Sequence, residues 1–237
     1  MTSDRRAFLT STATGVLLLG CSRSAPPAST GPGAAATAAK PGAKDDGDDE
    51  VTPVEDLMRE HGVLRRIMYL YDDAIQRLAG RREVPLDALA ACAGIVRHVI
   101  EDYHEKLEED FLFPRFEKAG KLADLTAILR RQHQAGRTWT DHIVALARAP
   151  LADADRDKLA TALRGFNHMY RPHAAREDTV LFPELRGLVG KHEYEELGDQ
   201  FEDKEKQMLG DHGFEHAVAD VARLEQAFGL DDLSKLT

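Results

Sequence analysis

A histidine and a glutamate spaced four residues apart recur in two matching segments of this sequence. The first motif reads H-E-K-L-E-E-D-F-L-F-P over residues 104–114, and the second reads H-A-A-R-E-D-T-V-L-F-P over residues 173–183. In both, another acidic residue follows the glutamate and the motif closes on Leu-Phe-Pro. Helical residues four apart lie one above the other, so each motif can direct an imidazole and a carboxylate at one point, as a pair of metal ligands would.

Each motif is preceded by a further histidine, His61 before the first and His133 before the second. A single histidine on an apolar helix face is more often a hydrogen-bonded core residue than a ligand. The duplication favours ligands, because it predicts two helical hairpins that each offer a histidine on one helix and His-x-x-x-Glu on the next. The six predicted ligands are His61, His104, Glu108, His133, His173 and Glu177.

The donor set indicates which metal to expect. Six inward nitrogen and oxygen donors exceed what one tetrahedral zinc ion takes. None of the six is a cysteine, the ligand that would favour zinc or copper(I), and the two cysteines of the sequence cannot form a thiolate metal site. Imidazole together with carboxylate suits iron, and manganese is the other metal that such a set accepts. Two metal ions about 3.5–4 Å apart could share Glu108 and Glu177 as bridges, since carboxylate-bridged pairs occur in bundle cores.

The composition is typical of a soluble globular protein, with 30% charged and 43% hydrophobic residues. The formal net charge of -10 argues against a nucleic-acid partner, which would require basic patches to neutralise phosphates. The acidic residues are spread along the predicted helices, so we interpret them as a solvated surface.

The first 51 residues are expected to lie outside the folded domain, as an export signal followed by a tether. Residues 1–21 place Arg5 and Arg6 before a short apolar run that ends at Cys21, which resembles a twin-arginine export signal with a lipobox. We therefore expect an exported protein, periplasmic or extracytoplasmic, anchored in the membrane through a lipid on Cys21. A plain cleaved export signal is the alternative. Residues 22–51 are rich in Ala, Pro, Gly and Asp and are expected to form a disordered tether.

Residues 52–190 are predicted to form an all-α, up-down four-helix bundle. Thr52-Pro53-Val54-Glu55 is a capping box that starts the first helix. The second helix is expected over Leu86–Ala119 and the third over Leu122–Ala149, and the fourth follows Pro150. Residues 191–237 are predicted to form a C-terminal helical extension that packs against the bundle or against a second copy of the chain.

Two residues point to local distortions beside the ligands. Gly136 lies near His133 and lowers helix stability by about 1 kcal/mol relative to alanine, so we expect it to permit a close approach around the site. Pro172 precedes His173 inside the fourth helix and is expected to kink it.

These residues resemble the hemerythrin-like family, the HHE cation-binding domain, over about residues 52–190. The resemblance rests on the six predicted ligands and on the phrase from Tyr170 to Pro183; the segment Gly210–Glu215 also resembles an extension of some members. It implies an up-down four-helix bundle that holds a non-haem di-iron centre and binds dioxygen or nitric oxide.

One position departs from the oxygen-carrying members of that family. They place a second histidine one turn after the histidine of the third helix, where this chain has Arg137. The resemblance implies that Glu105 replaces the missing ligand, and Arg137 is expected either to point outward or to pair with Glu105. A carboxylate in place of an imidazole makes a harder site that favours the oxidised metal, which supports sensing or redox work over reversible oxygen transport.

Three functional hypotheses follow. The first is an exported, lipid-anchored di-iron protein that binds O2 or NO for sensing, scavenging or storage. The second is a di-iron redox enzyme that acts on peroxide, NO or O2, although the sequence shows no dedicated general acid or base. The third is a metal-free helical lipoprotein with a structural role.

Overall fold

The computed structural model describes residues 51–236. The predicted signal of residues 1–21 and nearly all of the predicted tether lie outside the described residues. Within residues 51–236 every regular element is helical, as the sequence predicts. None of these helices is both long enough and apolar enough to cross a lipid bilayer.

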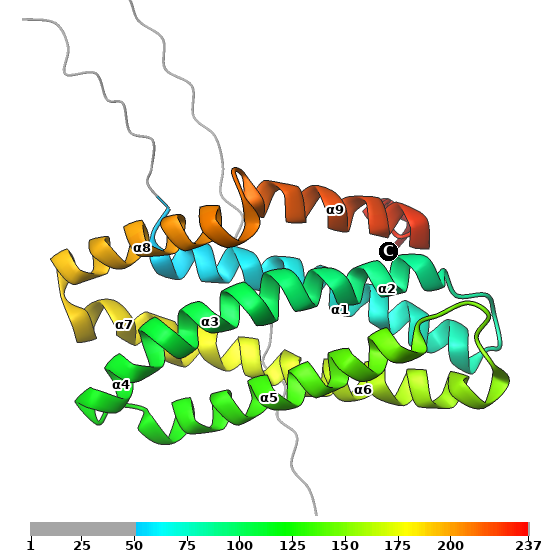
Figure 1. Ribbon diagram of the computed structural model, residues 1–237, viewed down its shortest axis with the longest axis horizontal. Helices are drawn as coiled ribbons and strands as arrows, with labels where there is room; N and C mark the ends of the chain where they lie inside the picture. The colour runs from blue at the N-terminus through cyan, green and yellow to red at the C-terminus, as the bar shows by residue number, and fades with distance from the viewer. Residues whose placement is uncertain (1–50, 237) are drawn as a thin grey trace, which may run out of the picture. The chain divides into compact units, whose positions relative to one another are not determined.

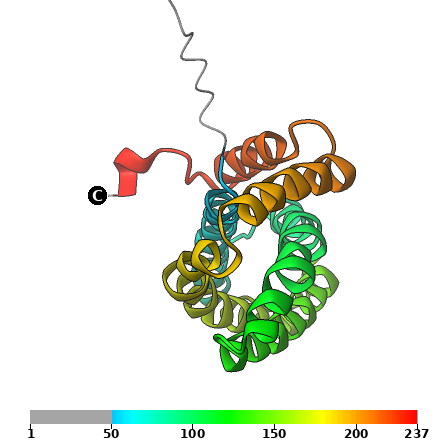
Figure 2. The same ribbon diagram turned by 90° about the vertical axis from the view of Figure 1, so that its left-hand side faces the viewer.

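Four long helical segments lie side by side and surround a common centre when viewed end-on (Figures 1 and 2). The first segment is α1 (Pro53–Ala79). The second is the continuous run of α2 (Leu86–Ile95), η1 (Val96–His104), α3 (Glu105–Leu107), η2 (Glu108–Leu112) and α4 (Phe113–Ala119). The third is α5 (Ala123–Leu146), and the fourth is the run of α6 (Asp153–Arg176), η3 (Glu177–Leu181) and α7 (Phe182–Val189). We call segments one and two the first hairpin, and segments three and four the second hairpin.

The helix ends follow from local sequence. Thr52 Oγ1 accepts a hydrogen bond from the Glu55 backbone at 3.3 Å, and Glu55 Oε2 accepts one from the Thr52 backbone at 3.0 Å. The predicted capping box is therefore present. The second segment ends at Gly120, whose φ of 65° is the left-handed conformation that favours glycine. α6 continues through Pro172 to Arg176.

The second and fourth segments widen into π-helix within the two motifs. The backbone N–H of Phe113 donates to the carbonyl of Glu108, and that of Phe182 donates to the carbonyl of Glu177, five residues back in each case. The proline that ends each motif follows directly. Proline lacks an N–H, and in an α-helix its ring clashes with the carbonyl four residues back. The wider π turn relieves this clash. These π turns place the two glutamates at matching points of the two hairpins.

Two apolar clusters fill the interior, and the predicted ligands lie between them along each helix. One cluster includes Tyr71 and Phe166, and the other includes Phe113 and Phe182. On α1, for example, His61 lies between Leu57 and Leu64, which belong to different clusters. The polar residues therefore form one layer with apolar packing on both sides.

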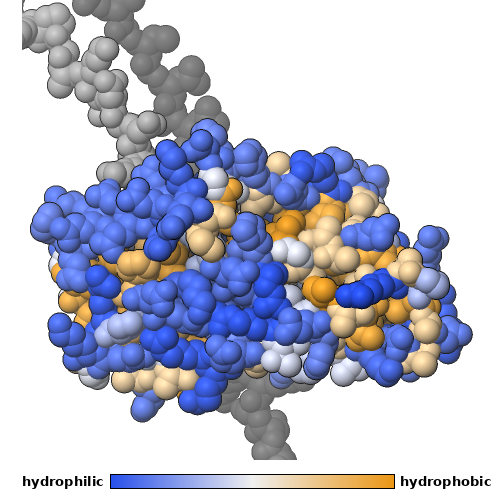
Figure 3. All heavy atoms as spheres, viewed as in Figure 1, coloured by the Kyte–Doolittle hydropathy of each residue, from blue (hydrophilic) through white to orange (hydrophobic). Residues whose placement is uncertain are grey.

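The C-terminal extension packs against the four segments. Its helices α8 (Lys191–Leu209) and α9 (Gly213–Phe228) lie along α1 and the second segment (Figure 1), and a short 3-10 turn, η4 (Leu233–Leu236), follows. Phe201 of α8 packs edge-on against Phe111 with ring centroids 5.8 Å apart, and Arg66 donates two hydrogen bonds of 2.7 Å to Glu225 of α9. Hydrophilic side chains gather over α8, while apolar ones gather over α2 and α9 (Figure 3).

Candidate metal centre

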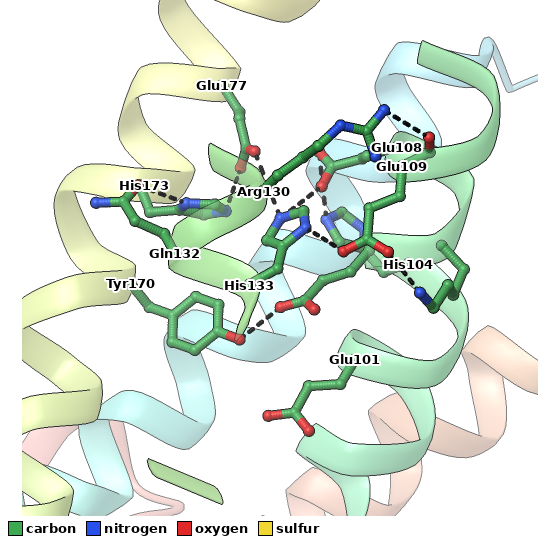
Figure 4. Close-up of polar contacts among 12 residues, drawn as sticks. Glu101, His104, Glu108, Glu109, Arg130, Gln132, His133, Tyr170, His173 and Glu177 are labelled. Carbon is green, nitrogen blue, oxygen red and sulfur yellow. Dashed lines mark hydrogen bonds and ion pairs between the residues drawn. The ribbon is translucent and has the colours of Figure 1, made fainter. Parts of the chain in front are cut away.

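The six predicted ligands meet at one level between the four segments, and each is at most 3% exposed. Figure 4 shows the centre from the side of α5 and α6. Their donor atoms form two groups that share Glu108. The first group is Glu108, His133, His173 and Glu177, and the second is His61, His104 and Glu108, with the atoms of each group within 4.8 Å of one another.

Each of the two glutamates lies between imidazoles from different helices. Glu177 Oε2 is 3.1 Å from His173 Nε2 and 3.5 Å from His61 Nε2. Glu108 Oε2 is 3.3 Å from His133 Nε2, and its Oε1 is 3.8 Å from His104 Nε2. Each carboxylate therefore lies between one histidine of the first hairpin (His61 or His104) and one of the second (His133 or His173). A ligand that bridges two metal ions would occupy such a position.

Every histidine of the centre is oriented by an acceptor on its outer nitrogen. The Nδ1 atoms of His61, His104, His133 and His173 lie 2.7, 2.6, 2.9 and 3.0 Å from oxygens of Asp178, Glu60, Glu109 and Gln132, respectively. Because these oxygens accept, we assign the ring hydrogen to Nδ1. The Nε2 atom of each ring then directs a lone pair inward, as metal-binding histidines do.

The acidic residues that follow Glu108 and Glu177 each bond a histidine of the opposite hairpin. Glu109 of the first motif bonds His133 of the second hairpin, and Asp178 of the second motif bonds His61 of the first. The sequence showed these acidic residues in both motifs but gave them no role. Their partners depend on how the two hairpins dock, which sequence spacing does not define.

The phenylalanine of each Leu-Phe-Pro stacks on the same histidine ring that the acidic residue of its motif bonds. Phe113 stacks on His133 and Phe182 stacks on His61, with ring centroids 5.6 Å apart in both cases and interplanar angles of 22° and 19°. Each motif therefore contributes a histidine and a glutamate to the centre. It also fixes the orientation of a histidine that belongs to the other hairpin.

The remaining two acceptors come from the residue immediately before each upstream histidine. Glu60 precedes His61 and bonds His104, while Gln132 precedes the histidine of α5 and bonds His173. Sequence reasoning missed both residues. The signal was available, since the same position carries a hydrogen-bond acceptor in both repeats.

Glu105, the seventh predicted ligand, lies beside the centre and is engaged by other groups. Its Oε1 accepts a hydrogen bond from the Tyr170 hydroxyl at 2.5 Å, and its Oε2 is 2.7 Å from Arg137 Nη2. Arg137 also lies 3.0 Å from Glu109. Of the four histidines of the centre, only His133 shares a group of possible metal ligands with Glu105, and Glu109 completes that group. Of the two expectations for Arg137, the pairing with Glu105 is therefore the one observed.

Gly136 makes room for this side chain arrangement. A Cβ atom at position 136 would overlap the hydroxyl group of Tyr170. The expectation that this glycine permits a close approach is confirmed, and the group that approaches is the phenol that bonds Glu105.

The buried carboxylates of the layer lack the hydrogen bonds that would stabilise their charge. None of the four carboxylate oxygens of Glu108 and Glu177 accepts a hydrogen bond from any described residue, and His133 Nε2 also lacks a partner there. Burial and the nearby charge of Glu177 raise the pKa of Glu108 well above its usual range. Burial lowers the pKa of His133 to about 4, which keeps this ring neutral as a ligand must be. Buried carboxylates without hydrogen bonds and inward lone pairs fit bound metal ions.

Comparison with known proteins assigns the family. A profile of the hemerythrin HHE cation-binding domain matches residues 52–185.

The chain belongs to this family.

Two relatives support the assignment without adding a function. The uncharacterized protein Rv1995 of Mycobacterium tuberculosis and the uncharacterized protein Mb2018 of Mycobacterium bovis are each 46% identical to this chain over 189 residues. The match covers 79% of this chain and 74% of each relative. No solved structure matches the chain. Hemerythrin HHE domains bind metal cations, typically iron, and the two ligand groups of this hemerythrin domain could hold such ions.

Proposed function

We propose that this protein is an exported non-haem di-iron protein that binds O2 or NO at a carboxylate-bridged site. Its bundle would then have the up-down topology of the hemerythrin fold. The observation that supports the proposal most strongly is the convergence of four imidazole Nε2 atoms on two buried glutamates whose oxygens have no other described partner.

The residues divide naturally between two iron ions. His61 and His104 would hold one ion, and His133 and His173 would hold the other. Glu108 and Glu177 would bridge them. Each ion then receives fewer protein donors than the six of an octahedral site, which leaves room for a small ligand. When bound, the irons supply reversible electron donation to that ligand.

The surrounding residues hold this arrangement dry and fixed. The four Nδ1 bonds orient the imidazoles, and the stacked phenylalanines limit their rotation. Apolar clusters on both sides keep bulk water from the layer. These features favour stable binding of a small diatomic molecule.

A redox enzyme acting on peroxide, NO or O2 is the second candidate, and one observation favours it. The ring of Tyr170 packs edge-on against His173 with centroids 5.6 Å apart, and its hydroxyl donates to Glu105 at 2.5 Å. A buried phenol in contact with a ligand ring can supply a proton during turnover.

Mixing the reduced protein with O2, NO or peroxide and following the visible spectrum tests the proposal. We expect a stable adduct with O2 or NO that reverses when the gas is removed. Repeated consumption of peroxide without damage to the centre would support the enzyme instead. The absence of any spectral change in iron-loaded protein would contradict both.

We also propose that residues 1–21 export the protein and that a lipid on Cys21 anchors it outside the cytoplasm. Fractionation of cells that express the full chain tests this. Wild type should sediment with membranes, and Cys21→Ala should not. Equal recovery of both proteins in the soluble fraction would contradict the anchor.

A further inference from the structure

The outer face of α5 and α6 is basic in a chain that is acidic overall. Residues 125–140 of α5 and 158–176 of α6 contain no aspartate or glutamate, whereas the whole chain has a formal net charge of -10. The same two stretches carry six arginines and one lysine. The helices α8 and α9 lie on the other side of the bundle (Figures 1 and 2), so the described part of the chain leaves this face uncovered.

Three of these arginines are free to meet a partner. Arg131, Arg164 and Arg176 are exposed, and none of their side chains forms an ion pair or a hydrogen bond with another described residue. The remaining arginines of the two stretches pair with carboxylates elsewhere in the bundle. An exposed guanidinium without a partner attracts anionic groups and can bind a carboxylate through two hydrogen bonds.

The basic face lies directly over one half of the metal centre. His133 and His173 meet with their ring centroids 4.9 Å apart, and α5 and α6 run in opposite directions (Figure 1). Arg131, two residues before His133, and Arg176, three residues after His173, therefore lie at nearly the same level of the bundle.

Only a thin layer of protein separates this face from the ligand rings. The exposed residues at this level between the two arginines include Ala135 of α5 and Pro172 of α6, which are both small. Gln132 is half-buried on α5, and its Oε1 lies 3.0 Å from His173 Nδ1. A single hydrogen bond thus connects a side chain of the surface to a ligand ring, which is a short path for an electron.

An apolar pocket continues the same face away from the centre. It has a volume of about 450 Å³ and is lined in part by Trp139, Leu146 and Ala162. Trp139 is the only tryptophan of the chain, and its indole is held against Gly165, where a Cβ atom would overlap it. Tryptophan and arginine are the residues that most often carry the binding energy of protein interfaces. The face therefore has the composition of a protein-binding surface rather than of a simple anion site.

The dimensions of the face fit a transient encounter. Residues 128–139 of α5 span about 16 Å, and residues 161–176 of α6 span about 22 Å. Two neighbouring helices present a strip roughly 20 Å wide, so this chain would bury roughly 300–450 Å². The total for both partners then stays below about 1,200 Å², which is the range of weak electron-transfer encounters.

We propose that this face docks a small acidic electron-transfer protein that delivers electrons to the metal centre. The inference rests on the proposed function, because the electrons would reduce the proposed irons. Carboxylates of the carrier would bind Arg131, Arg164 and Arg176, and its redox group would face His133 and His173. In each encounter the reduced carrier loses one electron and one Fe³⁺ ion of the centre becomes Fe²⁺, so two encounters would reduce both irons.

The test is the docking of a tryptophan-free plant-type [2Fe–2S] ferredoxin, an acidic carrier used as the probe, on the metal-free full-length chain. Docking is followed as quenching of Trp139 fluorescence by the iron–sulfur cluster. We expect saturable quenching that weakens as salt is added, because salt screens exposed charges. Arg131→Gln combined with Arg176→Gln should weaken binding about tenfold. Both side chains lack described partners, so the variant should fold as wild type does.

A charge-matched control is Arg82→Gln combined with Arg223→Gln. Both residues are exposed, and they lie away from the basic face, in the loop after α1 and on α9. This control should bind the ferredoxin as wild type does. The absence of quenching in wild type would overturn the docking surface, as would equal weakening in the two variants. Binding of wild type to phosphatidylglycerol vesicles in place of ferredoxin, lost in the Arg131 and Arg176 variant, would overturn the protein partner in favour of a membrane.

Electron delivery is measured separately on iron-loaded protein. The rate at which reduced ferredoxin is reoxidised should fall about tenfold in the Arg131 and Arg176 variant, since electrostatic steering changes association rates by factors of about 10–10³. Docking without reoxidation would overturn the electron-transfer role. If wild type retains no iron, the proposed function fails, and this outcome is distinct from a failure of docking because docking is measured on the metal-free chain.

Discussion

The Nε2 atoms of His61 and His104 face each other at 3.1 Å in the middle of the bundle. Each ring directs its Nδ1 hydrogen to a carboxylate, Asp178 for one and Glu60 for the other. Two neutral rings would therefore bring two lone pairs together, and a cation or a proton must lie between them. Two nitrogens bound at a right angle to one metal ion at about 2.1 Å would be about 3 Å apart. The observed distance is thus the spacing of two neighbouring ligands on one ion.

Removing the proposed bridge Glu177 should prevent the loading of two metal ions. Glu177→Ala takes away the carboxylate that contacts His61 and His173, so we expect bound iron to fall from two per chain to one or fewer. Glu184→Ala, an exposed glutamate of α7, is the matched control and should retain two. Metal analysis after anaerobic loading measures both. Full retention of iron by Glu177→Ala would show that Glu177 is not the bridge.

The same glycine-to-alanine change should have opposite effects at two helical positions. Gly136→Ala would drive a methyl group into Tyr170 and separate the Tyr170 hydroxyl from Glu105. We therefore expect the free energy of unfolding to fall by about 1–3 kcal/mol. Gly94→Ala meets no described atom within 4 Å and should stabilise α2 by up to about 1 kcal/mol. Urea unfolding of both variants measures the two effects. Destabilisation of similar size at both positions would contradict the close approach of Tyr170 to α5.

The acceptors on the outer histidine nitrogens should control metal affinity. Glu109→Ala removes the oxygen that orients His133, and we expect metal affinity to fall about 10–100-fold. Burial alone would raise the pKa of Glu109, but hydrogen bonds from His133 and Lys106 lower it to about 2, so the group is a carboxylate at neutral pH. Asp110→Ala, its exposed neighbour, should bind metal as wild type does. Competition with a chelator measures the metal affinity of the two variants. Equal affinities in Glu109→Ala and Asp110→Ala would contradict the role of Glu109 in orienting His133.

The stability of the metal-free protein should depend on pH through Asp56. The folded state holds this proton more tightly than the unfolded chain, with a pKa of about 7 against 3.8. Asp56 therefore makes the fold less stable as the pH rises through this range. We expect Asp56→Asn to stabilise the metal-free protein at pH 8, on the order of 1–3 kcal/mol, and much less at pH 4. Thermal unfolding at both pH values measures the difference, and a gain that is equal at both would contradict the buried state of this carboxyl group.

The sequence predicted the helical class because it follows from short-range spacing, and it predicted that six side chains face inward because all six lie on or beside apolar helix faces. Residues three and four apart share a helix face, and the duplicated His-x-x-x-Glu fixes two matching faces. The capping box at Thr52 and the stop at Gly120 are equally local, and both lie where the sequence placed them.

What the sequence did not predict depends on contacts between hairpins. The bonds from Glu109 to His133 and from Asp178 to His61 join segments that are far apart in the chain. The π turns lie where a proline ends each motif, and such a local widening is not described by helical periodicity. Arg137 was left with two orientations, because only tertiary packing decides that it meets Glu105.

The most direct test of the metal centre is the iron content of the full-length protein purified without oxygen. The proposed centre, in which four imidazole nitrogens and two bridging carboxylates bind the metal, predicts two iron ions per chain. Less than one iron per chain, with no other metal in its place, would contradict the di-iron centre.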